Sequence, residues 1–118
     1  MGKRILIVDD HPSFRSCARA VLQAEGFDVV GEAENGVQAL RAAKELQPDV
    51  VLLDVQLPDF DGFEVAERLQ GIETPPEVIL TSSRDTADFG SLIGSSAARG
   101  FVPKAELSGR ALTELLAA

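Results

Sequence analysis

The chain has 118 residues, of which 45% are hydrophobic and 25% are charged, which is typical of one soluble globular domain. Its formal net charge of -8 argues against a nucleic-acid-binding surface, because DNA-binding proteins present a basic face. No apolar run approaches the length of a membrane span, and the single cysteine, Cys17, excludes an internal disulfide and fits a reducing compartment. We therefore expect one cytoplasmic domain over residues 1–118.

Short apolar runs alternate along the chain with segments of helical periodicity. Runs of this length predict buried strands, and apolar stripes at spacings of three and four residues predict helices. The predicted strands, in chain order, are residues 5–8, 29–30, 50–53, 78–81 and 101–102. The predicted helices follow them in order, at 13–25, from Asn35-Gly36 to just before Pro48, from Gly62 onward, at 86–98, and around 112–116.

Individual residues add details of packing, termination or stability to three of these predicted helices. Cys17 lies on the apolar stripe of the first helix and is expected to pack inward, and Gly26 is expected to end that helix. In the second helix, Val37 is expected to face inward. The segment 86–98 contains Gly90 and Gly94, each of which costs about 1 kcal/mol relative to alanine in a helix interior. This helix is therefore expected to be the least stable element.

Strands that alternate with helices predict an α/β fold. We expect a doubly wound, five-stranded parallel sheet of order 2-1-3-4-5, of the flavodoxin-like type, with five helices. In this order Asp9, Asp10 and Asp54 meet at the carboxyl ends of the first and third strands, where ligands of such sheets bind. Like charges repel one another there, and a hard divalent cation relieves the repulsion, with Mg²⁺ the natural choice if phosphate is also present.

Four motifs make the chain resemble the receiver domains of two-component response regulators. They are Ile-Leu-Ile-Val-Asp-Asp-His-Pro (5–12), Val-Val-Leu-Leu-Asp-Val-Gln-Leu-Pro-Asp-Phe-Asp-Gly (50–62), Leu-Thr-Ser (80–82) and Gly-Phe-Val-Pro-Lys (100–104). The segment from Asp10 to Arg15 is similar to that of NarL-like receivers, which precede LuxR-type DNA-binding domains. No such domain follows in this sequence. We therefore expect a stand-alone receiver, with a piece of a longer regulator as the alternative.

The resemblance implies a role for five residues of these motifs. Asp54 is implied to accept a phosphoryl group from a phosphohistidine of a partner kinase. Asp10 is implied to bind Mg²⁺ directly, Asp9 to help directly or through water, and the backbone carbonyl of Gln56 to supply a further ligand. Lys104 is implied to pair with the phosphoryl oxygens as a point charge.

The resemblance also implies that a hydroxyl at the end of the fourth strand binds the phosphoryl group. Thr81, Ser82 and Ser83 all offer one, and strand alternation places Thr81 and Ser83 on one side and Ser82 on the other. We favour Ser82, because Thr81 is expected to be the last paired residue of its strand, and Thr81 is the second choice. Phe101 is implied to be an aromatic switch that turns inward when the hydroxyl moves.

The expected partners are a sensor histidine kinase or phosphotransfer protein and an unknown downstream protein, without direct contact to nucleic acid or membrane. The downstream protein is expected to contact the face formed by the 86–98 helix, the fifth strand and the last helix. His11, the single histidine, is expected to be a loop residue beside the site rather than a metal ligand or general base.

The resemblance implies a phosphorylated signalling switch rather than an enzyme, and two alternatives remain. One is a Mg²⁺-dependent phosphatase with an aspartyl nucleophile. Such enzymes usually have a second acid two residues after the nucleophile, where this chain has Gln56. The other is an interaction module that keeps only the receiver fold. Such a module would be expected to lose an acid, the hydroxyl or the lysine.

Overall fold

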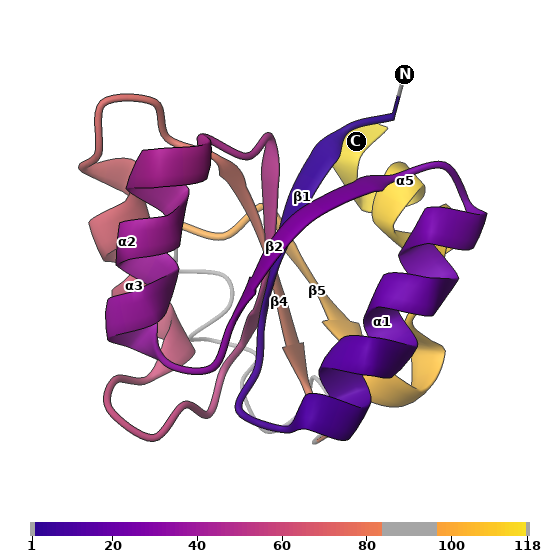
Figure 1. Cartoon of the computed structure of the whole chain (residues 1–118), viewed down its shortest axis with the longest axis horizontal. Coiled ribbons are helices and arrows are strands. Elements are labelled where there is room, and N and C mark those ends of the chain that lie inside the picture. The colour runs from indigo at the N-terminus through magenta and orange to yellow at the C-terminus, as the bar shows by residue number, and fades with distance from the viewer. Residues whose placement is uncertain (1, 84–96, 118) are drawn as a thin grey trace.

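The computed structural model of the chain describes residues 2–83 and 97–117, and it contains one parallel sheet (Figure 1). The strands lie in the order β2-β1-β3-β4-β5, which confirms the predicted topology. Their bounds are β1 (Arg4–Val8), β2 (Asp28–Ala33), β3 (Val50–Asp54), β4 (Glu77–Ser82) and β5 (Gly100–Pro103).

Helices cover both faces of the sheet. Figure 1 shows α1 (Pro12–Ala24) and α5 (Gly109–Ala117) on one face, and α2 (Gly36–Leu46) and α3 (Gly62–Gln70) on the other. The described residues thus contain four α-helices, together with the 3-10 turn η2 (Lys104–Glu106). The predicted helix at 86–98 falls almost entirely outside the described ranges. No helix in the described part of the chain is long and apolar enough to cross a membrane.

The strands are buried on both sides, as a parallel sheet between two helix layers requires. All eight residues of the apolar runs 5–8 and 50–53 are at most 1% exposed. Alternate side chains enter two separate cores. The core under α2 and α3 receives Leu6, Val8, Val51, Leu53, Val78 and Leu80, and the core under α1 and α5 receives Ile5, Ile7, Val50, Leu52, Ile79 and Val102.

Local signals define where the helices begin and end. Asn35 and Asp61 cap α2 and α3, each accepting a 2.8 Å hydrogen bond from the backbone N–H three residues later. α1 begins instead with Pro12 in its first turn, after His11, whose side chain makes no capping hydrogen bond. Gly26 follows the end of α1 with a φ of 94°, a conformation that favours glycine, so the predicted end of this helix is confirmed.

Two predicted core positions are wrong. Val37 is 49% exposed, and Cys17 is also exposed. The buried residues are Gly36, Ala39 and Ala43 in α2, and Ala18 and Leu22 in α1. A residue one position away from this buried stripe is rotated by about 100° toward solvent.

Candidate functional site

The carboxyl ends of β1 and β3 bring carboxylates together. Val8 of β1 pairs with Leu53 of β3. Asp9 and Asp54 directly follow these two residues, so the two acids are neighbours. Ligand atoms of Asp9, Asp10, His11 and Asp54 all lie within 4.8 Å of one another, an arrangement that could hold a metal ion. Asp9 is fully buried, Asp54 is 3% exposed, and Asp10 lies at the solvent rim. The sheet order therefore produces the expected cluster.

Lys104 directly follows β5 and reaches into this cluster. Its Nζ lies 2.6 Å from Asp9 Oδ2 and 3.3 Å from Asp54 Oδ2, and its side chain is only 16% exposed. The same ammonium lies over the ring of Phe14 in α1, 4.6 Å from the ring centroid, which is within the range of a cation–π contact. One lysine is therefore held between two buried carboxylates and an aromatic face.

The electrostatics of the cluster show an excess of negative charge. Burial raises the pKa of Asp54 to about 6, and the charge of Asp9 acts in the same direction. The backbone N–H of Gln56, which donates to Asp54 Oδ1 at 3.0 Å, and Lys104 oppose this rise. Burial lowers the pKa of Lys104, but contact with Asp9 and Asp54 outweighs it, so that this pKa lies above its usual value. A cation at the cluster would relieve the remaining repulsion.

Hydrogen bonds to the side chain and to the backbone carbonyl of Asp9 hold the turn after β1 in place. The backbone N–H of His11 donates to Asp9 Oδ1 at 2.8 Å, and Arg15 Nη1 donates to the Asp9 carbonyl oxygen at 2.6 Å. Arg15 Nε also donates to Glu32 Oε1 at 3.1 Å, which connects α1 to β2. The sequence shows Arg15 at the end of the segment from Asp10 to Arg15. Its contact with the Asp9 backbone could not be predicted, because it depends on how α1 is placed against the sheet.

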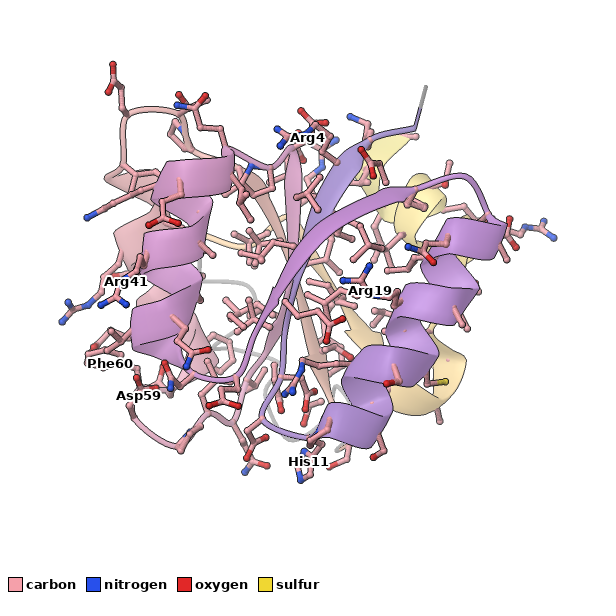
Figure 2. All side chains as sticks on the ribbon, in the orientation of Figure 1. Arg4, His11, Arg19, Arg41, Asp59 and Phe60 are labelled. Carbon is pink, nitrogen blue, oxygen red and sulfur yellow. The ribbon has the colours of Figure 1, made fainter. Side chains whose placement is uncertain are left out.

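The loop after β3 is anchored to the helix α2. Asp59 accepts hydrogen bonds from the first two backbone N–H groups of α2, at 2.7 and 3.0 Å. Figure 2 shows His11 and Asp59 near the starts of α1 and α2, at the same edge of the sheet. Where α3 begins, a Cβ on Gly62 would overlap the carbonyl oxygen of Asp54, so the close approach requires glycine. The two α2 residues that donate to Asp59 lie more than 20 positions earlier in the chain.

The register of β4 bears on the choice of hydroxyl. β4 extends one residue further than predicted, because Ser82 pairs with Pro103, so Thr81 is not the last paired residue. Thr81 pairs with Asp54 across β3 and β4, which places the two side chains on the same face, whereas Ser82 points to the opposite face. Thr81 is fully buried, and its Oγ1 has no hydrogen-bond partner among the described residues.

Phe101 occupies β5 beside the core under α2 and α3. It pairs in register with Leu80 and is partly buried against that core. Its position one residue before Val102 places it on the face opposite Thr81. The switch role of Phe101 stays a prediction.

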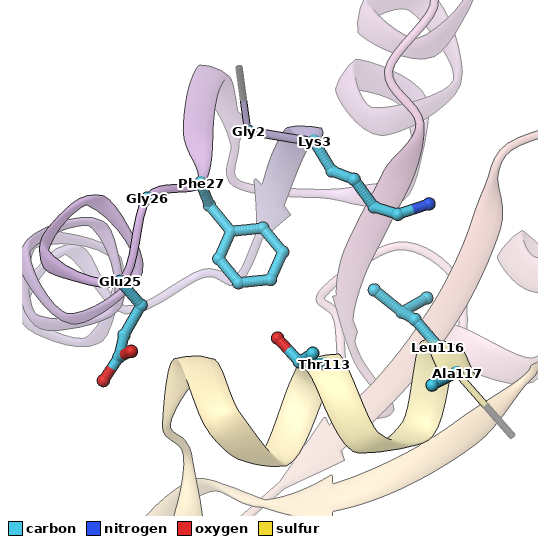
Figure 3. A pocket seen from close by; sticks show the side chains of 8 residues that line it. All are labelled: Gly2, Lys3, Glu25, Gly26, Phe27, Thr113, Leu116 and Ala117. Atoms are coloured by element: carbon cyan, nitrogen blue, oxygen red, sulfur yellow. The ribbon is translucent and has the colours of Figure 1, made fainter.

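A separate cavity of about 340 Å³ lies far from these carboxylates (Figure 3). It is lined by residues at the start of β1, the end of α1 and the end of α5, which are Gly2, Lys3, Glu25, Gly26, Phe27, Thr113, Leu116 and Ala117. Because β1 starts at Arg4, next to this cavity, and ends at Val8, just before Asp9, the cavity lies at the opposite edge of the sheet. It supplies none of the residues of the acidic cluster.

The fold and the cluster define a class of protein, a parallel α/β domain with an acidic, lysine-containing site at its switch point. Residues 5–116 match the family model of the response regulator receiver domain, and the chain belongs to this family. It is therefore a receiver domain of two-component signalling, as the four sequence motifs indicated.

Relatives with known names support this assignment. The chain is 40% identical over 106 residues to the transcription regulator BvgA of Bordetella pertussis, an alignment that covers 90% of this chain and 51% of BvgA. It is 47% identical over 90 residues to the DNA-binding response regulator MtrA of Mycolicibacterium smegmatis, covering 75% of this chain and 38% of MtrA. The chain thus spans about half the length of these relatives, or less. Whether it acts alone stays a prediction.

Solved structures show the same fold. The signal receiver domain of the response regulator NarL from Mycobacterium tuberculosis has a TM-score of 0.86 and 34% identity, with 99% of this chain and 98% of that chain covered. A LuxR-family response regulator from Aurantimonas sp. SI85-9A1 has a TM-score of 0.85 and 29% identity, with 99% and 86% covered. The predicted similarity to NarL-like receivers is confirmed.

Proposed function

We propose that Asp54 accepts a phosphoryl group from a histidine kinase or a phosphotransfer protein, in a reaction that requires Mg²⁺. A carboxylate oxygen of Asp54 attacks the phosphorus atom. The new P–O bond forms as the P–N bond of the phosphohistidine breaks, and the imidazole leaves. The observation that supports this proposal is the position of Asp54, buried beside Asp9 and Lys104 at the carboxyl end of the central strand. Phosphoryl transfer depends mainly on positioning and charge neutralisation, and this site offers both.

The donor set suits Mg²⁺, which prefers carboxylate and carbonyl oxygens. Asp10, Asp9 and Asp54 would hold the ion together with the backbone carbonyl of Gln56. Burial raises the pKa of Asp54 first and the charge of Asp9 adds to the rise, so a bound cation would favour the ionised form of this carboxyl group. When bound, the ion would neutralise charge on the carboxylates and on the incoming phosphoryl oxygens.

Lys104 would supply the second positive charge. Its Nζ already lies 3.3 Å from Asp54 Oδ2, so that a short movement away from Asp9 is enough to reach a phosphoryl oxygen on Asp54. Phe14 keeps the ammonium near the site through its ring face. Lys104 is thus a phosphoryl-binding group, and Asp54 remains the acceptor without it.

We assign the phosphoryl-binding hydroxyl to Thr81 in preference to Ser82. Thr81 pairs with Asp54 in register and carries a buried hydroxyl without a partner in the described part of the chain. A buried hydroxyl without a hydrogen bond is costly, and a phosphoryl oxygen on Asp54 would supply the missing acceptor.

The partner face is proposed to include β5, α5 and the segment 86–98, of which residues 84–96 lie outside the described ranges. The glycine- and serine-rich composition of that segment supports a role in switching, since weakly stable elements change arrangement most easily. A cytoplasmic setting is proposed from the lone cysteine and the family.

The deciding experiment is incubation with acetyl phosphate and Mg²⁺, followed by intact mass measurement. We expect one added phosphoryl group on the wild-type chain, and none on Asp54→Asn or after chelation of Mg²⁺. Phosphorylation of Asp54→Asn to the same level would contradict the proposal, and continuous hydrolysis of unrelated phosphoesters would favour the phosphatase alternative.

A paired substitution tests the hydroxyl. Thr81→Ala is expected to accept the phosphoryl group but to lose most of the phosphorylation-induced chemical-shift change in β5, whereas Ser82→Ala retains it. The opposite result would return the role to Ser82. The measurement is the amide NMR spectrum with and without acetyl phosphate.

A further inference from the structure

His11 lies at the mouth of the acidic cluster with a ring nitrogen directed at two carboxylates. Its Nδ1 lies 3.2 Å from Asp9 Oδ1 and 3.1 Å from Asp10 Oδ1. The side chain is 65% exposed, so this nitrogen borders both the cluster and solvent. His11 thus lies in the loop beside the site, as expected, and its ring reaches two members of the acidic cluster.

The position of His11 is determined by the backbone around it. Its backbone N–H donates to Asp9 Oδ1 at 2.8 Å, and the next residue, Pro12, begins α1. Proline restricts the residue before it to extended backbone conformations, and His11 has φ -97° and ψ 111°. The ring is therefore presented to the cluster by a short and well-defined turn, and it is not needed to cap the helix.

The spacing of the ligand atoms resembles that of a coordination sphere. Around a cation with ligands at about 2.1 Å, adjacent ligands in an octahedron lie about 3.0 Å apart and opposite ligands about 4.2 Å apart. The distances from His11 Nδ1 to the two carboxylates are close to the first value, and one ligand atom from each of the four residues lies within 4.8 Å of the others, somewhat more than the second value. One ion can therefore contact His11 together with the acids, after small side-chain adjustments.

We propose that His11 is a ligand that determines the metal preference of this site, shifting it from Mg²⁺ toward divalent transition metals such as Mn²⁺ and Ni²⁺. Imidazole binds these metals well, whereas Mg²⁺ prefers oxygen ligands and keeps its waters. An all-oxygen site lacks this nitrogen, so its relative affinity for Mn²⁺ and Ni²⁺ is lower. The inference rests on the proposed function, because it concerns the ion that assists phosphorylation of Asp54.

The test compares metal affinities in the unphosphorylated chain. The chain has no Trp or Tyr, so isothermal calorimetry is better suited than intrinsic fluorescence. All proteins carry Cys17→Ser, because an exposed thiol can also bind transition metals, and no histidine tag is retained. Mg²⁺, Mn²⁺ and Ni²⁺ are titrated into this background protein, into His11→Ala, and into His11→Asn, which keeps a polar side chain but removes the imidazole.

We expect both His11 variants to lose about tenfold or more of their affinity for Mn²⁺ and Ni²⁺, with Mg²⁺ affinity changed by less than about threefold. Asp10→Asn is the matched control and is expected to weaken binding of all three ions. Equal changes for all three ions in the His11 variants, or no change in any, would overturn the proposal.

Direct ligation has its own measurement. His11 is the only histidine, so a histidine-type nitrogen coupling in the pulsed EPR spectrum of the Mn²⁺-loaded chain can arise only from it. We expect this coupling in the background protein and none in His11→Ala, and its absence from both would overturn the proposal. Failure of the background protein to bind Mg²⁺ at all would contradict the proposed function, whereas normal Mg²⁺ binding with an unchanged metal preference would contradict only the role of His11.

Discussion

Leu52 in the interior of the sheet and Asp54 at its carboxyl edge are both buried, but burial affects stability differently at the two positions. Leu52 and Asp54 belong to the same strand, and they are 0% and 3% exposed. Burial of the leucine removes apolar surface from water and stabilises the fold. Burial of the aspartate disfavours its charged form and raises its pKa, so ionisation at neutral pH costs stability. A two-residue step along β3 thus separates a region built for stability from one built for binding.

A substitution in the interior of the sheet should cause the largest change in stability. Leu52→Ala is expected to lower the free energy of unfolding by about 2–5 kcal/mol, because it leaves a cavity in a core that is fully packed. Urea denaturation measures this change. Val37→Ala, at a half-exposed position, is the control and should change stability by less than about 0.5 kcal/mol. Similar losses for both variants would remove the distinction between interior and surface.

A substitution that removes the buried charge at the carboxyl edge of the sheet should instead raise stability at neutral pH. Asp54 has a pKa of about 6 in the folded chain against an ordinary value of 3.8, so the unfolded state loses its proton first as the pH rises. Wild-type stability should therefore fall between about pH 4 and pH 6, and Asp54→Asn should remove this loss. At pH 7 without metal, the variant is expected to be more stable by at most about 3 kcal/mol, and the gain should disappear near pH 4.

Denaturation of both proteins across this pH range tests the prediction, with Asp28→Asn at an exposed position as the control. Added Mg²⁺ should reduce the advantage of Asp54→Asn, since the ion binds the ionised wild-type site. A variant that is less stable than wild type at pH 7 would show that burial of the Asp54 charge is fully compensated.

Substitution of Lys104 should change the free energy of unfolding less. The side chain is partly exposed, and without it Asp9 and Asp54 can be hydrated or protonated. Lys104→Ala is expected to lower stability by about 1–3 kcal/mol at pH 7, since it leaves Asp9 and Asp54 without their cation. Combination with Asp54→Asn should recover part of this loss, and a double-mutant cycle measures the coupling. Strict additivity would mean that the Lys104–Asp54 contact contributes nothing. Lys104→Ala should still accept a phosphoryl group but respond poorly to it.

Much of the fold and part of the site follow from the sequence. The apolar runs before Asp9 and Asp54 predicted buried parallel strands, because only a sheet covered on both faces has no polar side to its strands. The strand order then brought the two acids together, with Lys104 following the last strand. Asn35 and Gly26 marked helix boundaries through local backbone chemistry. These features depend on residues that are close in the chain, or on the few topologies that such a sheet allows.

Other features were decided only by packing between distant segments. Which hydroxyl shares a face with Asp54 depends on the register of β3 and β4, in which Thr81 pairs with Asp54 and Ser82 points to the opposite face. Val37 and Cys17 are exposed because the rotation of each helix follows its contact with the sheet, which an apolar pattern defines only to within about one position. The hydrogen bonds of Asp59 and the contacts of His11 likewise require the relative placement of loop and helix. Local sequence limits the backbone conformation, but contacts across the chain select the direction of each side chain.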